Sequence, residues 1–334
     1  MKRNLVAATL AVAVATPALA NEVNVYSYRQ PELIEPLTDA FTQKTGIQVN
    51  AVFLKKGLIE RLQAEGDRSP ADLIFTVDIS RLAGVVNAGL TQAVESPALQ
   101  QNIPASMRDA ENHWFGLTAR ARVIYASKDR VNDGEVTTYE DLADPKWKGR
   151  ICTRSGLNAY NLALTSAFIE HHGDAQAKAW LAGVKDNLAR KPQGNDRAQV
   201  KAIWAGECDI SVGNTYYMAL MLGKEDQKPW ADSVRIVFPK FANGGTHMNI
   251  SGMAMARHAP NQENALALME FLASEEGQRI YAEINHEYPV LDSVPASGLV
   301  ESWGDFERDQ IQLSDIAAHR KTAVLLVEEV GFDN

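Results

Sequence analysis

This 334-residue sequence has few long apolar runs, only two cysteines and no excess of positive charge. Beyond residues 5–16, no stretch approaches the roughly 18 uninterrupted apolar residues of a membrane-spanning helix. The 33 basic residues are outnumbered by 42 acidic ones, which argues against nucleic acid and anionic membrane surfaces as partners. A P-loop, a dinucleotide-binding glycine motif and a G-x-S-x-G elbow are also missing, so nucleotide binding and serine-hydrolase chemistry are not indicated.

The first twenty residues have the pattern of a cleaved export signal. Lys2 and Arg3 form a basic start, residues 5–16 are apolar, and residues 18–20 read Ala-Leu-Ala, an A-x-A cleavage site. Removing these residues changes the formal net charge from −9 to −11 and leaves a chain that begins near Asn21. No cysteine follows the cleavage site, so we expect no lipid anchor. The sequence predicts a soluble periplasmic protein that is not inserted in the membrane.

The two cysteines, Cys152 and Cys208, fit an oxidising compartment. Each opens a strand-like run, and adjacent parallel strands would bring the two within bonding distance. We therefore predict a disulfide between them. Two buried free thiols are the alternative.

The first part of the mature chain alternates strand and helix patterns. Strand-like runs at 24–28, 47–53 and 72–76 are separated by segments in which apolar residues recur at helical spacing. A helix opens at Pro31, which favours the first turn, and ends at Gly46. This alternation predicts a parallel sheet with helices on both faces.

A second α/β series follows the strand at 120–125, on which Arg120 and Arg122 share one face. We expect the strand at 234–239 to cross between domains and a helix to span 313–330. The sequence has no repeats, no low-complexity tract and no glycine-serine linker. Strands rather than a flexible tether therefore join the halves, which predicts two lobes around a cleft with a hinge.

Three tyrosines in the second series stand at strand-to-helix turns: Tyr160, Tyr216 and Tyr217. In the first turn of a helix, neighbouring side chains lie about 100° apart, so Tyr216 and Tyr217 can both face the carboxyl end of the preceding strand. Phenolate is a hard anionic ligand, and a bound cation can remove the proton of a phenol. Fe(III) fits this description best, whereas Cys2His2 spacing for zinc is missing. Packing of the rings in a core is the alternative.

Three phenolates fill only three of six octahedral positions, so water, an anion or a side chain of the other lobe must complete the shell. Arg29, Arg120 and Arg122 are candidates to hold a bidentate anion such as carbonate. Ser155 and Asn158, at the turn before Tyr160, could donate to the same anion, together with the backbone N–H groups of a helix N-terminus. Surface salt bridges are the alternative for the arginines.

Six segments together resemble the periplasmic ferric-iron-binding proteins of ABC uptake systems, which have the type II solute-binding, transferrin-like fold. The segments are 25–31, 70–73, 116–123, 154–161, 213–217 and 249–252. The Asn-Thr-Tyr-Tyr element at 214–217, with a tyrosine upstream at 160, is the most specific of them. The resemblance runs essentially from the signal peptide to the C-terminus.

By that resemblance, Tyr160, Tyr216 and Tyr217 are iron ligands from the second lobe. Many members of the family place a His or Tyr ligand just after the first strand, but here residues 28–31 read Tyr-Arg-Gln-Pro, with neither in register. The similar branch of the family completes the shell with a synergistic carbonate, which Arg29 could hold. Tyr28 remains a possible fourth phenolate.

The resemblance implies a monomeric, non-enzymatic protein that binds Fe(III) and delivers it to an inner-membrane ABC permease. It implies an N-terminal lobe of residues 21–119 and 244–294, and a C-terminal lobe of residues 120–243 and 295–334. The fold class expected is α/β, two lobes each with a mostly parallel sheet flanked by helices and joined by crossover strands. The alternative is a protein of the same fold that binds an organic cation or an oxyanion, with the tyrosines as a stacking box.

Overall fold

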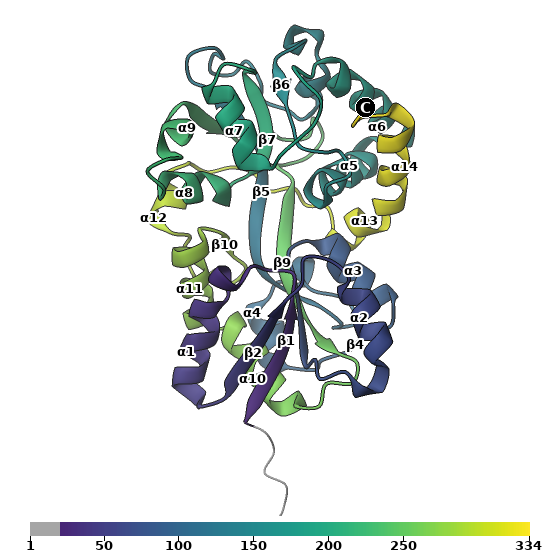
Figure 1. Cartoon of the computed structure of the whole chain (residues 1–334), viewed down its shortest axis with the longest axis vertical. Helices are drawn as coiled ribbons and strands as arrows, with labels where there is room; N and C mark the ends of the chain where they lie inside the picture. Colours follow the sequence, from purple (N-terminus) through teal and green to yellow (C-terminus); the bar gives the residue numbers. More distant parts are fainter. Residues whose placement is uncertain (1–20) are drawn as a thin grey trace, which may run out of the picture.

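The computed structural model describes residues 21–334 and shows two α/β lobes joined by long strands (Figure 1). The predicted signal peptide, residues 1–20, lies outside the described residues. Within the part of the chain that the structure describes, no helix is long and apolar enough to cross a membrane.

The strands are short except for the two that pass between the lobes. They are β1 (Glu22–Ser27), β2 (Gln48–Phe53), β3 (Leu73–Thr76), β4 (Thr91–Gln92), β5 (Phe115–Ser127), β6 (Ile151–Cys152), β7 (Ile210–Asn214), β8 (Val234–Val237), β9 (Met248–Ala256) and β10 (Tyr288–Pro289).

The helices pack around these strands in both lobes (Figure 1). They are α1 (Glu35–Thr45), α2 (Leu58–Glu65), α3 (Ile79–Asn87), α4 (Pro97–Asn102), α5 (Ala159–His172), α6 (Asp174–Asp186), α7 (Asp196–Trp204), α8 (Tyr216–Leu222), α9 (Lys228–Asp232), α10 (Gln262–Ala273), α11 (Glu275–Asn285), α12 (Gly298–Glu301), α13 (Leu313–Ala318) and α14 (Arg320–Val330). Short 3-10 turns occur at Pro31–Leu33, Gly66–Arg68, Ala105–Met107, Glu140–Ala143 and Pro145–Trp147.

Local signals set most of the helix ends. Helix α1 stops at Gly46, which has a φ of 74°, a left-handed conformation that glycine adopts without steric cost. Pro31 begins a 3-10 turn that precedes α1, rather than the α-helix itself. The helix expected over 313–330 is two helices, because the chain breaks at His319 between α13 and α14.

In the first lobe the sheet has the strand order β2-β1-β3-β9-β5. Strand β1 pairs in parallel with both β2 and β3, as the strand–helix alternation predicts. Strand β9 is antiparallel to both β3 and β5, because the chain leaves this lobe in β5 and returns to it in β9. The sheet is therefore mixed rather than mostly parallel.

In the second lobe, β5 lies between β7 and β8 and is antiparallel to both, while β6 pairs with β7 in parallel. The prediction that the strand at 234–239 crosses between domains is wrong. Strand β8 stays in the second lobe, where Val234 to Val237 pair with β5. The strand that returns the chain to the first lobe is β9, which begins at Met248.

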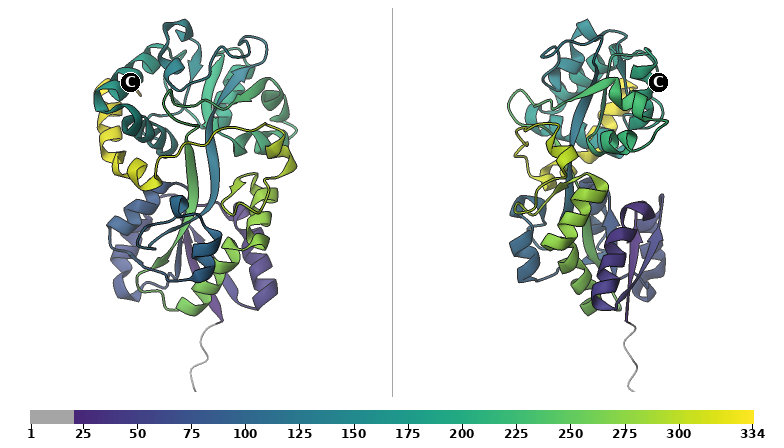
Figure 2. Two further views of the ribbon diagram at one scale, coloured as in Figure 1. Left: turned by 180° about the vertical axis from the view of Figure 1, so that it is seen from behind. Right: turned by 90° about the vertical axis from the view of Figure 1, so that its left-hand side faces the viewer.

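Strands β5 and β9 are the connection at the centre of the molecule, and both are buried along their whole length. The chain between α12 and α13 crosses behind them, as the two further views show (Figure 2). Helices α13 and α14 then pack against α5 and α6 of the second lobe (Figure 1). Three chain segments thus pass between the lobes, and the two-lobed α/β fold is confirmed.

The predicted disulfide is confirmed, since Cys152 and Cys208 are bonded and the described residues contain no free cysteine. The parallel neighbouring strands are as expected, but the cysteines do not open them: Cys152 ends β6, and Cys208 lies two residues before β7. The bond therefore fixes together the two strands that lead to the tyrosine-bearing helices.

Candidate functional site

The three predicted tyrosines lie together at the edge of the second-lobe sheet. Tyr160 is the second residue of α5, and Tyr216 and Tyr217 are the first two residues of α8. The hydroxyl oxygens of Tyr216 and Tyr160 are 3.4 Å apart, and the ring centroids of Tyr216 and Tyr217 are 4.3 Å apart. The phenols meet because β6 and β7 are parallel neighbours, so the helices that follow them start at the same edge.

These tyrosines form part of a cleft of about 590 Å³ that has residues of both lobes on its sides. Tyr28, the possible fourth phenolate, lies in the same cleft on the first-lobe side. Its hydroxyl oxygen accepts a hydrogen bond from the backbone N–H of Leu58 at 3.1 Å. The guanidinium carbon of Arg81 lies 4.4 Å from the centroid of its ring.

Burial disfavours the phenolate forms of Tyr216 and Tyr217 in the unliganded protein. It raises the pKa of Tyr216 well above the ordinary value of 10, and the neighbouring hydroxyls of Tyr160 and Tyr217 raise it further. Burial also raises the pKa of Tyr217, with a further contribution from Tyr160. Each of these two phenols must therefore lose a proton to a bound cation before it can act as a phenolate ligand.

Arg29 lies in the cleft, but its guanidinium group already has partners. Its Nη2 donates to Glu287 Oε2 at 2.6 Å, and its Nη1 donates to Ser251 Oγ. Glu287 also accepts from Thr118 Oγ1 at 2.8 Å. Burial lowers the pKa of Arg29, but the Glu287 carboxylate more than offsets this and raises it overall. Arg29 is thus held in a buried ion pair rather than a surface one.

The two arginines of β5 have different surroundings, although both are buried. Arg120 lines the cleft, donates from Nη1 to Ser251 Oγ at 2.9 Å, and has its guanidinium carbon 5.9 Å from the centroid of the Tyr160 ring. Its Nε has no hydrogen-bond partner among the described residues. Arg122 does not line the cleft, and its two terminal nitrogens donate to Asp196, Asn214 and Asn161.

The two residues predicted to act at the turn before Tyr160 also have different surroundings. Asn158 lines the cleft and caps α5, with its Oδ1 accepting from the backbone N–H of Tyr160 at 3.0 Å. The hydroxyl of Ser155 instead donates to the carboxylate of Asp333, which also accepts from the backbone N–H of Gly156 at 2.7 Å. Ser155 is not among the residues that line the cleft, because its side chain is held by the C-terminal segment.

Sequence reasoning missed much of the positive charge in this cleft. The lining contains seven arginine and lysine side chains but two glutamates, in a chain whose overall charge is negative. The basic residues are Arg29, Lys55, Arg81, Arg120, Arg154, Arg197 and Lys224. Arg154, for example, has its guanidinium carbon 5.3 Å from the centroid of the Tyr160 ring. Arg29 and Arg120 were predicted from the sequence; of the other five, only Arg154 lies in a segment that the sequence analysis singled out, residues 154–161.

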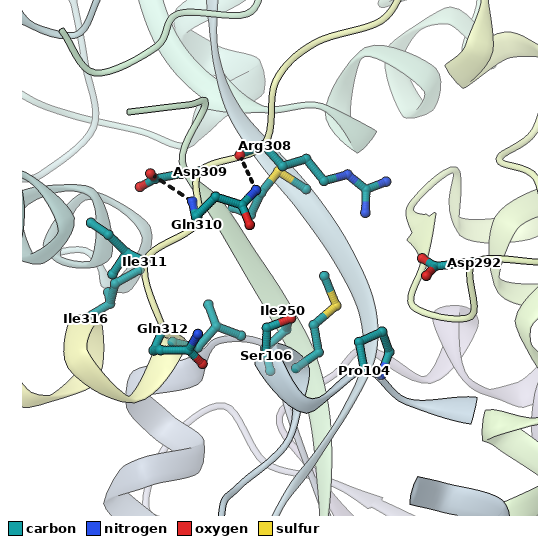
Figure 3. A pocket seen from close by; sticks show the side chains of 13 residues that line it. Pro104, Ser106, Ile250, Asp292, Arg308, Asp309, Gln310, Ile311, Gln312 and Ile316 are labelled. Atoms are coloured by element: carbon teal, nitrogen blue, oxygen red, sulfur yellow. Dashed lines mark hydrogen bonds between the residues drawn. The ribbon is translucent and has the colours of Figure 1, made fainter. Parts of the chain in front are cut away.

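A second cavity, of about 250 Å³, includes Met248 and Ile250 of β9 and the chain around Arg308–Gln312 in its lining (Figure 3). None of the three tyrosines lines it. Its lining mixes apolar side chains such as Ile250, Ile311 and Ile316 with polar and charged ones such as Asp292, Arg308 and Gln312. Among residues 21–334, no group of three or more His, Cys, Asp or Glu side chains is placed to hold a metal ion. The tyrosine cleft is therefore the candidate site.

Comparisons with known proteins agree with this fold. Residues 68–304 match the family described as bacterial extracellular solute-binding protein. The chain is 42% identical to iron uptake protein A1 of Synechocystis sp., over 95% of this chain and 89% of that protein. Among solved structures it resembles the apo ferric ion-binding protein A of Pasteurella haemolytica, with a TM-score of 0.91 and 54% identity over 94% of this chain and 99% of that one.

A further solved structure is the Trichodesmium protein in complex with iron and citrate ligands. Its TM-score is 0.89, and it is 42% identical over 93% of this chain and 99% of that chain. The matched family covers most of this chain, and the similar proteins align with it almost from end to end. This chain therefore belongs to the bacterial extracellular solute-binding protein family.

Proposed function

We propose that this protein binds Fe(III) in the interlobe cleft through the phenolates of Tyr160, Tyr216 and Tyr217, with a carbonate-type anion completing the shell. It then delivers the ion to an inner-membrane ABC permease. The observation that carries the proposal is the convergence of the three phenols, with two hydroxyl oxygens 3.4 Å apart at the starts of neighbouring helices.

The chemistry of the donor set supports a trivalent, oxygen-seeking ion. Three phenolates carry three negative charges, which neutralise a 3+ ion, and hard oxygen ligands suit small, highly charged cations. The raised pKa values of Tyr216 and Tyr217 mean that a weakly charged cation would not displace their protons readily. We therefore expect loading to release protons, at least one from each of these two phenols.

The anion has donors beside the tyrosines. We infer that Arg120 and Asn158 hold it, because both line the cleft and Arg120, whose Nη1 lies 3.8 Å from Glu287 Oε1, is less closely paired with that carboxylate than Arg29, whose Nη2 lies 2.6 Å from Oε2. Arg29 lies at the same place but is paired with Glu287, so it contributes positive charge and holds Glu287 in position. Ser155 is outside this proposal, because its hydroxyl group donates to Asp333.

The organic-cation alternative is disfavoured by the charge of the cleft. Seven basic side chains line it, and an organic cation, unlike a ferric ion, would not deprotonate the phenols to gain compensating negative charge. An oxyanion alone would suit the basic residues but would leave the three converging phenols without a role. A ferric ion together with an anion uses both groups.

The relatives support the transport role. Iron uptake protein A1 and the ferric ion-binding protein A are named for iron, and the Trichodesmium protein was solved with it. The family consists of solute-binding proteins, which fits a non-enzymatic role. We propose lobes of residues 21–119 with 244–294 and 120–243 with 295–334, a monomer, and a periplasmic location after removal of residues 1–20. One buried apolar cluster lies wholly within the proposed N-terminal lobe, which supports this division, whereas the other, mainly in the proposed C-terminal lobe, also includes N-terminal-lobe residues such as Ile79, Met248 and Tyr288.

The test is a visible absorption titration of iron-stripped protein with ferric citrate, with and without bicarbonate. We expect a red to orange colour from phenolate-to-iron charge transfer, together with proton release. Tyr216→Phe should lose most of the band. Tyr288→Phe is the matched control, because Tyr288 does not line the cleft and its hydroxyl has no partner among the described residues.

A wild-type protein that stays colourless and binds no iron by elemental analysis would reject the proposal. An unchanged spectrum in Tyr216→Phe would remove Tyr216 from the shell. If the colour develops fully in ferric citrate without bicarbonate, citrate rather than carbonate is the anion, and the carbonate part of the proposal fails.

A further inference from the structure

Behind the tyrosines, Arg122 connects the two segments that carry them. It lies on β5 with 2% of its surface exposed. Its Nη2 donates to Oδ1 of Asn161 at 2.6 Å, and its Nη1 donates to Oδ1 of Asn214 at 2.9 Å. Asn161 follows Tyr160 in the first turn of α5, and Asn214 ends β7, two residues before Tyr216.

One of these connections continues to the phenols themselves. Nδ2 of Asn214 donates to the hydroxyl oxygen of Tyr216 at 3.4 Å, and that hydroxyl donates to Tyr160 at 3.4 Å. The guanidinium carbon of Arg122 lies 5.8 Å from the centroid of the Tyr160 ring. Arg122 is thus linked to the Tyr216 hydroxyl through Asn214, and to the Tyr160 hydroxyl through Asn214 and Tyr216 in turn.

Asp196 holds this arginine from the other side. It is the first residue of α7 and is fully buried. Its Oδ2 accepts from Arg122 Nη1 at 2.6 Å and from the backbone N–H of Asn214 at 3.1 Å, and its Oδ1 accepts from Arg154 Nη1 at 3.0 Å. The carboxylate therefore fixes two arginines and the end of β7 at once.

We propose that Arg122 and Asp196 are positioning residues that set the spacing of the Tyr160 and Tyr216 hydroxyls before the ferric ion arrives. This inference rests on the proposed function. The terminal nitrogens of Arg122 have partners in Asp196, Asn161 and Asn214, so its role is to orient the ligands and not to hold the anion.

The geometry of the guanidinium group explains why an arginine stands here. Its planar fork presents donors at fixed angles and can bind Asn161 and Asn214 at the same time, which fixes the start of α5 relative to the end of β7. A lysine keeps the charge but is a point donor on a flexible chain. Replacing a residue that holds a metal ligand in position typically lowers metal affinity about 10- to 100-fold.

The experiment compares Arg122→Lys with Arg130→Lys. Arg130 is an arginine of the same lobe that also pairs with an aspartate, with Nε 2.5 Å from Asp209 Oδ1, but it does not line the cleft or contact a tyrosine-bearing helix. Ferric affinity is measured by competition with citrate, alongside the maximum of the charge-transfer band and the unfolding of the iron-free protein. For Arg122→Lys we expect a 10- to 100-fold lower affinity and a shifted, broader band. Arg130→Lys should leave both unchanged.

A second variant distinguishes misplaced iron ligands from a general loss of folding. Asn161→Ala removes one acceptor of Arg122 but leaves the ion pair with Asp196, so the buried charges stay compensated. It should also shift the band and weaken binding.

The proposal is overturned if Arg122→Lys and Asn161→Ala both bind iron with wild-type affinity and an unchanged band maximum. It is also overturned if affinity falls only in proportion to the stability of the iron-free protein, with no change in the band. A wild-type protein without any charge-transfer band would instead show that the proposed function itself has failed.

Discussion

His247 is a buried histidine just before β9, with 1% of its surface exposed. Neither ring nitrogen has a hydrogen-bond partner within residues 21–334. Burial lowers its pKa to about 3, because no water is available to solvate the imidazolium. The charged groups that face it are Asp309, which favours the imidazolium, and Arg122, Arg120 and His171, which oppose it. The ring is therefore neutral in the folded protein at physiological pH.

We predict that His247 makes the protein less stable as the pH falls from about 6.5 towards 3. In this range the unfolded chain binds a proton at this histidine and the folded protein does not, so the free energy of unfolding rises with pH by at most about 1.4 kcal/mol per pH unit. His247→Gln should have a shallower dependence when unfolding by denaturant is measured between pH 4 and pH 7. His258→Gln, which changes an exposed histidine, should keep the wild-type slope. Equal slopes in all three proteins would show that His247 is not the group responsible.

At the scale of the elements, the position of β7 decides where Tyr216 and Tyr217 lie. Gly213 in this strand packs against the ring of Tyr125 on β5, and the hydroxyl of Tyr125 donates to the backbone carbonyl of Asn214 at 2.6 Å. A Cβ atom at Gly213 would lie 2.3 Å from Cε2 of Tyr125. No side chain fits there without a shift of the strand or the ring.

Gly213→Ala is expected to lower the free energy of unfolding by about 1–3 kcal/mol, the usual cost of overpacking a core, and to weaken iron binding. The matched control is Gly223→Ala at the end of α8. Its added Cβ would meet its nearest atom, the Ala219 carbonyl oxygen, at 3.6 Å, an ordinary contact. Denaturant unfolding and the iron titration check both variants. If Gly213→Ala matched the control in both measurements, the close packing of β7 on Tyr125 would not position the site.

At the scale of the whole molecule, the distribution of the cleft residues between the two lobes predicts that the lobes move when the ion binds. All three tyrosines belong to α5 and α8 of the second lobe, whereas Tyr28 and Arg29 lie on the opposite side of the cleft. An ion held by the tyrosines alone keeps positions open towards the first lobe. An anion that bridges to that lobe would favour closure about β5 and β9, the central connection between the lobes (Figure 1).

We expect iron with bicarbonate to reduce the radius of gyration in small-angle X-ray scattering. Tyr216→Phe, treated in the same way, should keep the larger value of the iron-free protein, because the ion that triggers closure is bound weakly. Tyr288→Phe serves again as the control that closes. An iron-loaded wild-type protein with an unchanged radius of gyration would show that the site is complete within the second lobe.

The sequence alone determined the features that depend on neighbours along the chain. Helix ends such as Gly46, the placement of Tyr160, Tyr216 and Tyr217 at strand-to-helix turns, and the disulfide beside two neighbouring strands all follow from local patterns. These patterns are short, and their physical causes, such as a left-handed glycine or parallel strands that share an edge, act within one or two elements.

Only the tertiary structure decided which charged groups are free to meet a ligand. Arg120 and Arg122 look equivalent on one face of a strand, yet Arg122 is paired with Asp196, which lies 74 residues away in the chain, while Arg120 borders the cleft. Arg29 is paired with Glu287, 258 residues away, and Ser155 with Asp333. A buried guanidinium or hydroxyl group takes the partner that folding places beside it, and the periodicity of the chain carries no information about so distant a partner.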